Sequence, residues 1–166
     1  MKKEEEAMMH KGTIIMVFGV IVAGALLLGF ASGLQAAEDR VIYLAAIEPK
    51  GGVTVDKEPF PNGELPKGGG YVKTAPNQAG RWEVSVYQFS PATVVVKQGE
   101  RVTLEMVGIN GAKHSVHVEK YLPKHSVLKR GEIVRLQFTA DTPGIFKIHC
   151  EEHQPAMEGT LVVLPR

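Results

Sequence analysis

The sequence predicts an all-β protein, an antiparallel Greek-key β-sandwich preceded by one apolar helix near the N-terminus. From Arg81 to Arg166, apolar and polar residues alternate over short stretches, which is the period of half-buried strands. Turn-forming residues at 98–99, 129–131 and 142–144 separate these stretches. The same region lacks the pattern of a long helix. Short strands at this spacing are typical of a sandwich or Greek-key barrel.

Each predicted strand has an inward face that follows from the alternation. The clearest stretches are 82–86, 101–106, 134–139 and 145–150, and a last strand is expected over 160–164. In the first, Trp82, Val84 and Val86 are expected to point inward together. In the stretch that ends at Cys150, the sulfur shares the face of Phe146 and Ile148, so we expect it to point into the apolar interior.

The composition of the chain excludes several classes of partner and of site. The 166 residues carry 19 Lys and Arg against 18 Asp and Glu, a formal charge of +1. A near-neutral chain has no global field that attracts nucleic acid, so we expect no nucleic-acid partner. Cys150 is the single cysteine. An intrachain disulfide and a four-cysteine zinc or iron–sulfur site are therefore excluded.

Residues 1–37 contain an apolar run from Ile14 to Leu34. A run of this length can span a bilayer, and it exceeds the about 7–15 residues of a typical signal-peptide core, so we predict an uncleaved membrane anchor. A cleaved signal peptide, which would leave a secreted soluble protein, is the alternative, and a buried core helix is a third interpretation. The first two interpretations place the rest of the chain on the periplasmic or other extracytoplasmic side.

Residues 38–80 are predicted to be a linker or a segment that wraps over the domain. Between Glu48 and Gly80 there are five prolines and seven glycines, too many for an independent packed core. A stretch before it, Val41 to Ile47, could add one strand to the sheet. Residues 81–166 form the predicted β-domain.

The alternation along each strand also predicts which histidines point inward and which point outward. His114 shares the face of Val116 and Val118, so we expect it to point inward. His117 and His149 fall on the opposite faces of their strands. With His125 and His10 they are expected to face solvent.

A predicted metal site follows the strand that ends at Cys150. The loop 150–157 carries Cys150, His153 and Met157, and Pro155 helps to reverse the chain. Thiolate and thioether donors select copper, and two histidines, a cysteine and a distant methionine are the blue-copper ligand set. We therefore predict one copper ion, held by His114, Cys150, His153 and Met157. Zinc accepts Cys and His, but a thioether is a poor zinc ligand.

Several of these stretches resemble the cupredoxins, the family of plastocyanin, amicyanin and azurin and of the copper domain of cytochrome oxidase subunit II. The similar stretches are 89–91, 94–100, 114–115, 138–144 and 149–159, and the resemblance covers about half of the chain. It implies a Greek-key sandwich and the same four copper ligands. It also implies that electrons enter or leave through His153.

The chain departs from the family pattern in ways that bear on its site. A binuclear copper centre of the oxidase type needs a second cysteine where this chain has Gln154, so a mononuclear site is expected. Three residues separate His153 from Met157, a spacing between those of amicyanin and plastocyanin. Ser115 and Glu151 stand where many members have Asn and Ser or Thr. The subfamily therefore stays open.

The expected function is transfer of single electrons between redox partners such as a cytochrome or an oxidase. Copper delivery or storage, and a role as an accessory copper-domain subunit of a respiratory oxidase complex, are the alternatives. We expect the chain not to be an enzyme, because a nitrite-reductase-like enzyme needs a second such domain or a second copper site. The 86 residues from Arg81 onward are too few to supply either.

Overall fold

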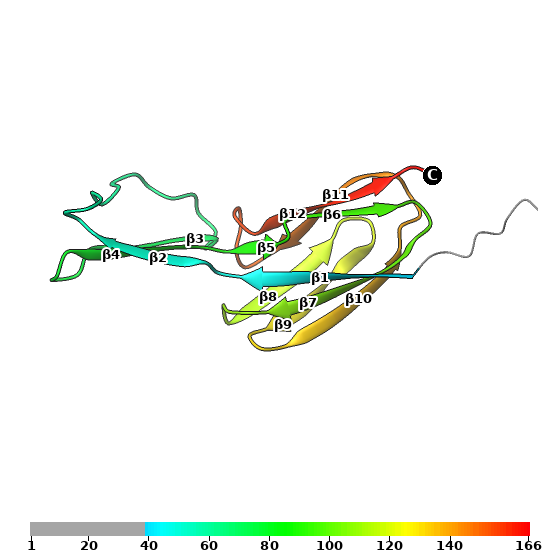
Figure 1. The fold of residues 1–166 in the computed structure, drawn as a ribbon, viewed down its shortest axis with the longest axis horizontal. Helices are drawn as coiled ribbons and strands as arrows, with labels where there is room; N and C mark the ends of the chain where they lie inside the picture. The colour runs from blue at the N-terminus through cyan, green and yellow to red at the C-terminus, as the bar shows by residue number, and fades with distance from the viewer. Residues whose placement is uncertain (1–38) are drawn as a thin grey trace, which may run out of the picture. The chain divides into compact units, whose positions relative to one another are not determined.

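The computed structural model describes residues 39–166, and every regular element in this part of the chain is a β-strand (Figure 1). The predicted apolar helix and membrane anchor lie outside the described residues. Between residues 39 and 166, no helix is long and apolar enough to cross a membrane. The prediction of an all-β fold is confirmed for the β-domain.

Two sheets make up the sandwich. The first has the strand order β10-β7-β1-β5, and the second has the order β6-β12-β11-β8-β9. The first contains β1 (Asp39–Ile47), β5 (Gln88–Ser90), β7 (Arg101–Gly108) and β10 (Ile133–Thr139). The second contains β6 (Thr93–Lys97), β8 (Lys113–Val118), β9 (Leu122–Lys129), β11 (Gly144–Cys150) and β12 (Glu158–Leu164). Neighbouring strands are antiparallel except β1 with β7 and β6 with β12, which are parallel.

The core lies between the two sheets and is built by the alternation that the sequence shows. In β7, Val102, Leu104 and Met106 are buried while their neighbours are more exposed. In β11, Ile148 and Cys150 are buried in the same cluster. Each strand buries one face because successive side chains point to opposite sides. The inward orientation predicted for the Cys150 side chain is thus confirmed.

The inward face predicted for the stretch 82–86 is wrong in part. In β4 (Arg81–Val86), Trp82 is buried, but Val84 is 43% exposed and Ser85 is buried instead. The Ser85 hydroxyl donates a hydrogen bond of 2.8 Å to the Glu48 carboxylate. β4 is the central strand of a separate sheet and does not pack its valines into the sandwich core, which removes the reason for strict alternation.

That separate sheet has the order β2-β4-β3, with β2 (Lys50–Thr54) and β3 (Tyr71–Thr74) on either side of β4. Figure 1 shows it projecting from the end of the sandwich where β1 finishes. The segment 38–80, expected to be a linker or wrapping segment, thus holds β1, β2 and β3. Its glycines and prolines interrupt the period-two pattern, which is why the short strands β2 and β3 could not be predicted.

Candidate metal centre

The loop that follows β11 folds back on itself within eight residues. The Met157 backbone N–H donates to the His153 carbonyl at 2.9 Å, and the Cys150 N–H donates to the Met157 carbonyl at 3.2 Å. Gln154 adds a side-chain bond of 2.7 Å to the Cys150 carbonyl. These bonds fix the positions of the three predicted ligands of the loop relative to one another. Met157 and Cys150 are both fully buried.

His114 of β8 meets this loop. The Cys150 Sγ lies 3.4 Å from His153 Nδ1 and 3.9 Å from His114 Nδ1. One donor atom from each of these three residues lies within 4.8 Å of the others, which is close enough to share one metal ion. The structure therefore brings together three of the four predicted ligands, and Met157 is on the same loop.

The His114 ring is held in the orientation that a metal ligand needs. Its Nε2 lies 3.0 Å from the Asn110 backbone carbonyl, which can only accept a hydrogen bond, so Nε2 carries the proton. The other nitrogen, Nδ1, then presents its lone pair toward Cys150. A metal-bound histidine usually donates its second N–H to a carbonyl or carboxylate in this way. The donor set therefore fits a metal ion.

Asn110 is itself fixed by the end of β1. The Glu48 backbone N–H donates to the Asn110 side-chain oxygen at 2.6 Å, and the Asn110 amide donates back to the Glu48 carbonyl at 2.8 Å. Gly111 follows with a φ of +82°, and a Cβ there would lie 2.9 Å from the His114 ring. A glycine is required at this position for both reasons. Sequence reasoning did not single out Asn110, because its role depends on a residue 62 positions away.

Glu152 ties the ligand loop to β8. Its carboxylate accepts hydrogen bonds from the Ser115 N–H and hydroxyl, each 2.5 Å, and forms an ion pair of 2.8 Å with Lys113. Burial alone would raise the pKa of Glu152, but the bonds from Lys113 and Ser115 outweigh it and hold that pKa far below its usual range. The contact between Ser115 and Glu152 therefore fixes the ligand loop against β8, and the sequence analysis did not predict it.

Burial shifts the pKa values of two of the predicted ligands. Burial raises the pKa of the Cys150 thiol to about 11 in the absence of a metal ion. Burial lowers the pKa of His153, and the neighbouring His114 lowers it further. A neutral imidazole is the form that binds metals, whereas the thiol must lose its proton to become a ligand. The site therefore favours a metal ion strong enough to displace that proton.

The Gly-rich segment before β3 covers the loop. Gly69 forms a parallel bridge with Gln154, and the Gly70 N–H donates to the Gln154 carbonyl at 3.1 Å. A Cβ at Gly70 would lie 2.3 Å from the His153 carbonyl oxygen, so only glycine fits there. Next to it, the Tyr87 ring stacks on the His153 ring with centroids 3.6 Å apart. His153 is consequently half-buried under two segments that lie far away in the sequence.

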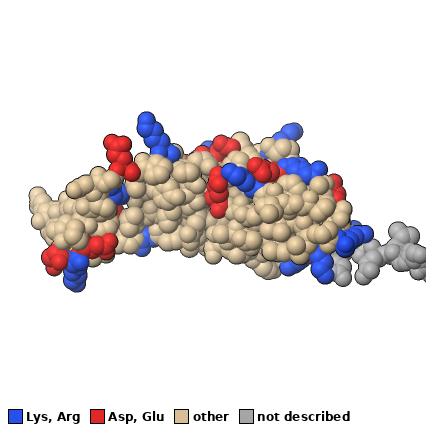
Figure 2. Space-filling model, turned by 90° about the horizontal axis from the view of Figure 1, so that it is seen from above, with Lys and Arg blue, Asp and Glu red and all other residues tan. Residues whose placement is uncertain are grey.

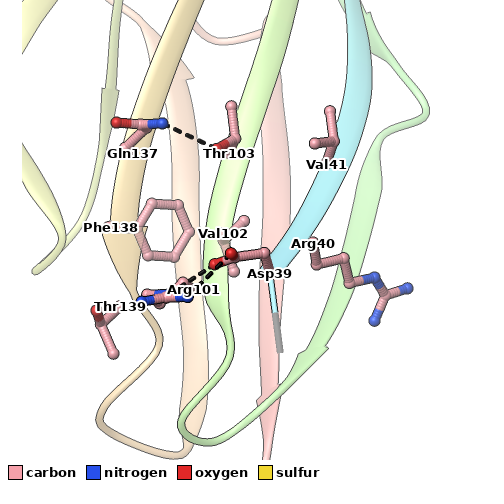
Figure 3. Close-up of a pocket in the computed structure, with 9 residues that line it drawn as sticks. All are labelled: Asp39, Arg40, Val41, Arg101, Val102, Thr103, Gln137, Phe138 and Thr139. Atoms are coloured by element: carbon pink, nitrogen blue, oxygen red, sulfur yellow. Dashed lines mark hydrogen bonds and ion pairs between the residues drawn. The ribbon is translucent and has the colours of Figure 1, made fainter. Parts of the chain in front are cut away.

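A pocket elsewhere in the sandwich contains none of the predicted ligands. It has a volume of about 510 Å³ and lies where β1, β7 and β10 meet at the Asp39 end of β1 (Figure 3). Arg101 forms an ion pair with Asp39 there, and Gln137 bonds to Thr103. Because β1 runs from Asp39 toward Ile47 and Glu48, the pocket is at the opposite end of the first sheet from Asn110.

Comparison with known proteins settles the family. A family model described as a cupredoxin-like domain matches residues 71–163, more than half of the chain. The chain belongs to the cupredoxin-like family. This family implies copper binding, in agreement with the convergence of His114, Cys150 and His153. No curated protein matches the sequence.

Two solved structures with a similar fold are larger copper proteins. A copper nitrite reductase from Nitrosomonas europaea matches 78% of this chain and 42% of its own, with 19% identity and a TM-score of 0.51. A blue copper oxidase from the same organism matches 78% of this chain and 40% of its own, with 16% identity and a TM-score of 0.50. This cupredoxin-like chain therefore spans less than half the length of either.

These structures correct one expectation. The sequence analysis predicted that the chain is not an enzyme, and similarity to a nitrite reductase and an oxidase, both enzymes, contradicts that prediction. The prediction failed because it took the small size of the domain as a reason against catalysis. A domain of this fold occurs within larger enzymes, so the small size of the domain is no argument against catalysis.

Proposed function

We propose that this cupredoxin-like protein holds one copper ion through His114, Cys150, His153 and Met157 and passes single electrons through it. The observation that carries the proposal is the position of His114. Its Nε2 is hydrogen-bonded to the Asn110 carbonyl, and its Nδ1 faces Cys150 Sγ and the half-buried ring of His153. When bound, copper supplies a one-electron couple that this mixed nitrogen and sulfur donor set suits.

The protein's own residues keep the ligands still during a change of charge. Asn110 fixes the His114 ring, Glu152 fixes the loop against Ser115, and Gly70 packs on the His153 carbonyl. A ligand set that moves little when the charge changes costs little reorganisation, which favours fast electron transfer. The buried Met157 side chain adds a soft thioether on the same loop.

His153 and Tyr87 form the proposed route between the site and a redox partner. The His153 ring is only half-buried, and the stacked Tyr87 ring is also partly exposed. A cytochrome or an oxidase is the proposed class of partner. Basic and acidic side chains are interspersed on the face in Figure 2, so neither sign of charge dominates that face.

We also propose that the domain works outside the cytoplasm, attached to a membrane by the segment from Ile14 to Leu34. The support is the length of that apolar run, which is enough to span a bilayer. Cleavage before Glu38 would instead give a secreted protein. Determination of the N-terminus of the mature chain, with its distribution between membrane and soluble fractions, decides between them.

The function is tested on the full chain loaded with Cu(II). We expect one copper per chain by metal analysis, an intense visible thiolate-to-copper band, and a reversible one-electron couple by voltammetry. Two coppers with a mixed-valence spectrum, or copper without a thiolate band, would contradict the proposal. Fast loss of copper to a mild chelator, together with an irreversible couple, would favour copper delivery instead.

A further inference from the structure

A second group of metal-binding side chains lies on the outer face of the second sheet. His117 comes from β8, His125 from β9 and His149 from β11, and Glu151 directly follows the last strand. His117 and His149 are direct partners in the β8–β11 pairing, so their side chains leave the sheet on the same side. The sequence analysis expected these histidines to face solvent, and it did not predict that they surround one carboxylate.

The side chains of His117, His125, His149 and Glu151, here called the outer cluster, lie at short distances from one another. The Glu151 Oε1 lies 3.0 Å from His149 Nε2, 3.2 Å from His125 Nε2 and 3.7 Å from His117 Nδ1. The His117 and His125 rings are stacked with centroids 5.3 Å apart. One donor atom from each of His117, His125 and Glu151 lies within 4.8 Å of the others. The Glu151 backbone is fixed as well, since its N–H donates to the Ser115 carbonyl at 3.0 Å.

One buried nitrogen atom of the outer cluster forms no hydrogen bond. Among the described residues, His117 Nδ1 is the buried side-chain nitrogen or oxygen atom without a hydrogen-bond partner. Its 3.7 Å distance to Glu151 is too long for a hydrogen bond. Burial lowers the pKa of His117, and His149 and His125 lower it further. A buried polar atom left unpaired is costly and calls for an explanation.

A metal ion would explain the arrangement. Zinc binds imidazole nitrogen and carboxylate oxygen at about 2.0–2.2 Å, so two donors of a tetrahedral site lie about 3.4 Å apart. The separations from Glu151 to His117 and His125 are close to that value. Two imidazoles without sulfur suit zinc-class ions, whereas calcium and magnesium prefer oxygen ligands throughout.

We propose that His117, His125 and Glu151 form a second metal site, for a zinc-class divalent ion, on the outside of the sandwich. His149 is a positioning residue that orients the Glu151 carboxylate through its Nε2. Three protein ligands leave a fourth position open to water. The site shares no ligand with the proposed copper site, although Glu151 directly follows Cys150 in the chain.

Zinc binding to the untagged full chain tests this proposal. We expect His125→Ala to lose one zinc equivalent relative to the wild type, measured by titration calorimetry and by metal analysis after dialysis. Glu151→Gln should weaken the same equivalent by about 100-fold or more, and His149→Ala by about tenfold, the effect of removing an outer partner of a ligand. His125 is half-exposed, so its replacement leaves the core intact. Glu132→Gln, an exposed carboxylate in the turn after β9, is the matched control and should bind as the wild type does.

The outcome is independent of the proposed copper site. Cys150→Ser should abolish the thiolate-to-copper band but keep the zinc equivalent that His125→Ala removes. If wild type and His125→Ala bind the same number of zinc ions with the same affinity, the outer cluster is only a network of histidine–carboxylate hydrogen bonds, and the proposal is wrong. Equal loss in Glu132→Gln and Glu151→Gln would overturn it too, because zinc would then bind to surface carboxylates at large.

Discussion

Glu152 accepts hydrogen bonds from both the backbone N–H and the hydroxyl of Ser115, and so joins the ligand loop to the strand that carries His114. The two residues are 37 positions apart in the chain. Their contact fixes the distance between the two parts of the metal centre before any metal is bound. It also makes the metal-free site sensitive to acid.

Replacement of Glu152 tests that sensitivity. We expect Glu152→Gln to lower the free energy of unfolding of the metal-free chain by about 2 kcal/mol at pH 7, the range for hydrogen bonds to a charged group. The pKa of Glu152 is lowered by folding, so its contribution is complete above the ordinary value of 4.5 and is lost as the pH falls through the folded pKa. The difference between variant and wild type should therefore shrink below pH 4.5. Urea unfolding at several pH values measures it.

The control for this experiment is Glu83→Gln. Glu83 is an exposed carboxylate paired with an exposed arginine, so its replacement should change stability little at any pH. A difference between Glu152→Gln and wild type that stays constant from pH 7 down to strongly acidic conditions would show that the charge of Glu152 is not what stabilises the loop.

The two histidines of β8 should behave differently in the copper-loaded protein. His114→Ala is expected to remove the strong thiolate-to-copper band, because His114 is fully buried beside Cys150. His117→Ala should leave that band nearly intact, because His117 faces the outer cluster. Optical spectra of both variants measure this. A band that survives in His114→Ala and collapses in His117→Ala would place the copper on the other side of the sheet.

The close packing of Gly70 on the ligand loop gives a third prediction. A Cβ at this position would lie 2.3 Å from the His153 carbonyl and 2.8 Å from the Ala156 side chain. We expect Gly70→Ala to destabilise the chain by about 1–3 kcal/mol, as overpacking does, and to shift the thiolate-to-copper band. Gly63→Ala is the matched control, since nothing lies within 4 Å of a Cβ there. Equal unfolding midpoints for the two variants would show that the loop moves away at no cost.

Copper binding should release a proton from Cys150. Burial raises the pKa of this thiol to about 11, so it is protonated at pH 8 and must become a thiolate to bind the metal. Calorimetric titrations in buffers of different ionisation enthalpy should report about one proton released per copper. Cys150→Ser should release none. A wild-type titration whose heat is the same in every buffer would mean that the thiol is already ionised in the metal-free chain.

The sandwich was predictable because β7, β10 and β11 bury one face each, and such strands show a period of two. The four proposed copper ligands could be found because three of them lie within eight residues after a core strand. The resemblance to cupredoxins added the expected role of each. These are local patterns, which a single sequence displays.

The remaining features depend on contacts between distant residues. Asn110 and Glu48 are 62 positions apart, and Glu152 and Ser115 are 37 apart, so no local period marks them. The outer cluster was missed for a related reason. Strand phase correctly put His117 on the face opposite to His114, but only the pairing of β8 with β11 and β9 brings His149 and His125 beside it.

The reciprocal hydrogen bonds between Asn110 and Glu48 also limit how far the chain can be shortened from its N-terminal side without disturbing the site. A fragment that starts at Arg81 keeps all four proposed ligands, but it lacks β1, which pairs with β7 over eight residues, and it lacks Glu48 at the end of β1. Without them the Asn110 carbonyl is free to turn away from His114. A fragment that binds copper as the full chain does must therefore include β1 and Glu48, which precede all four proposed ligands in the sequence.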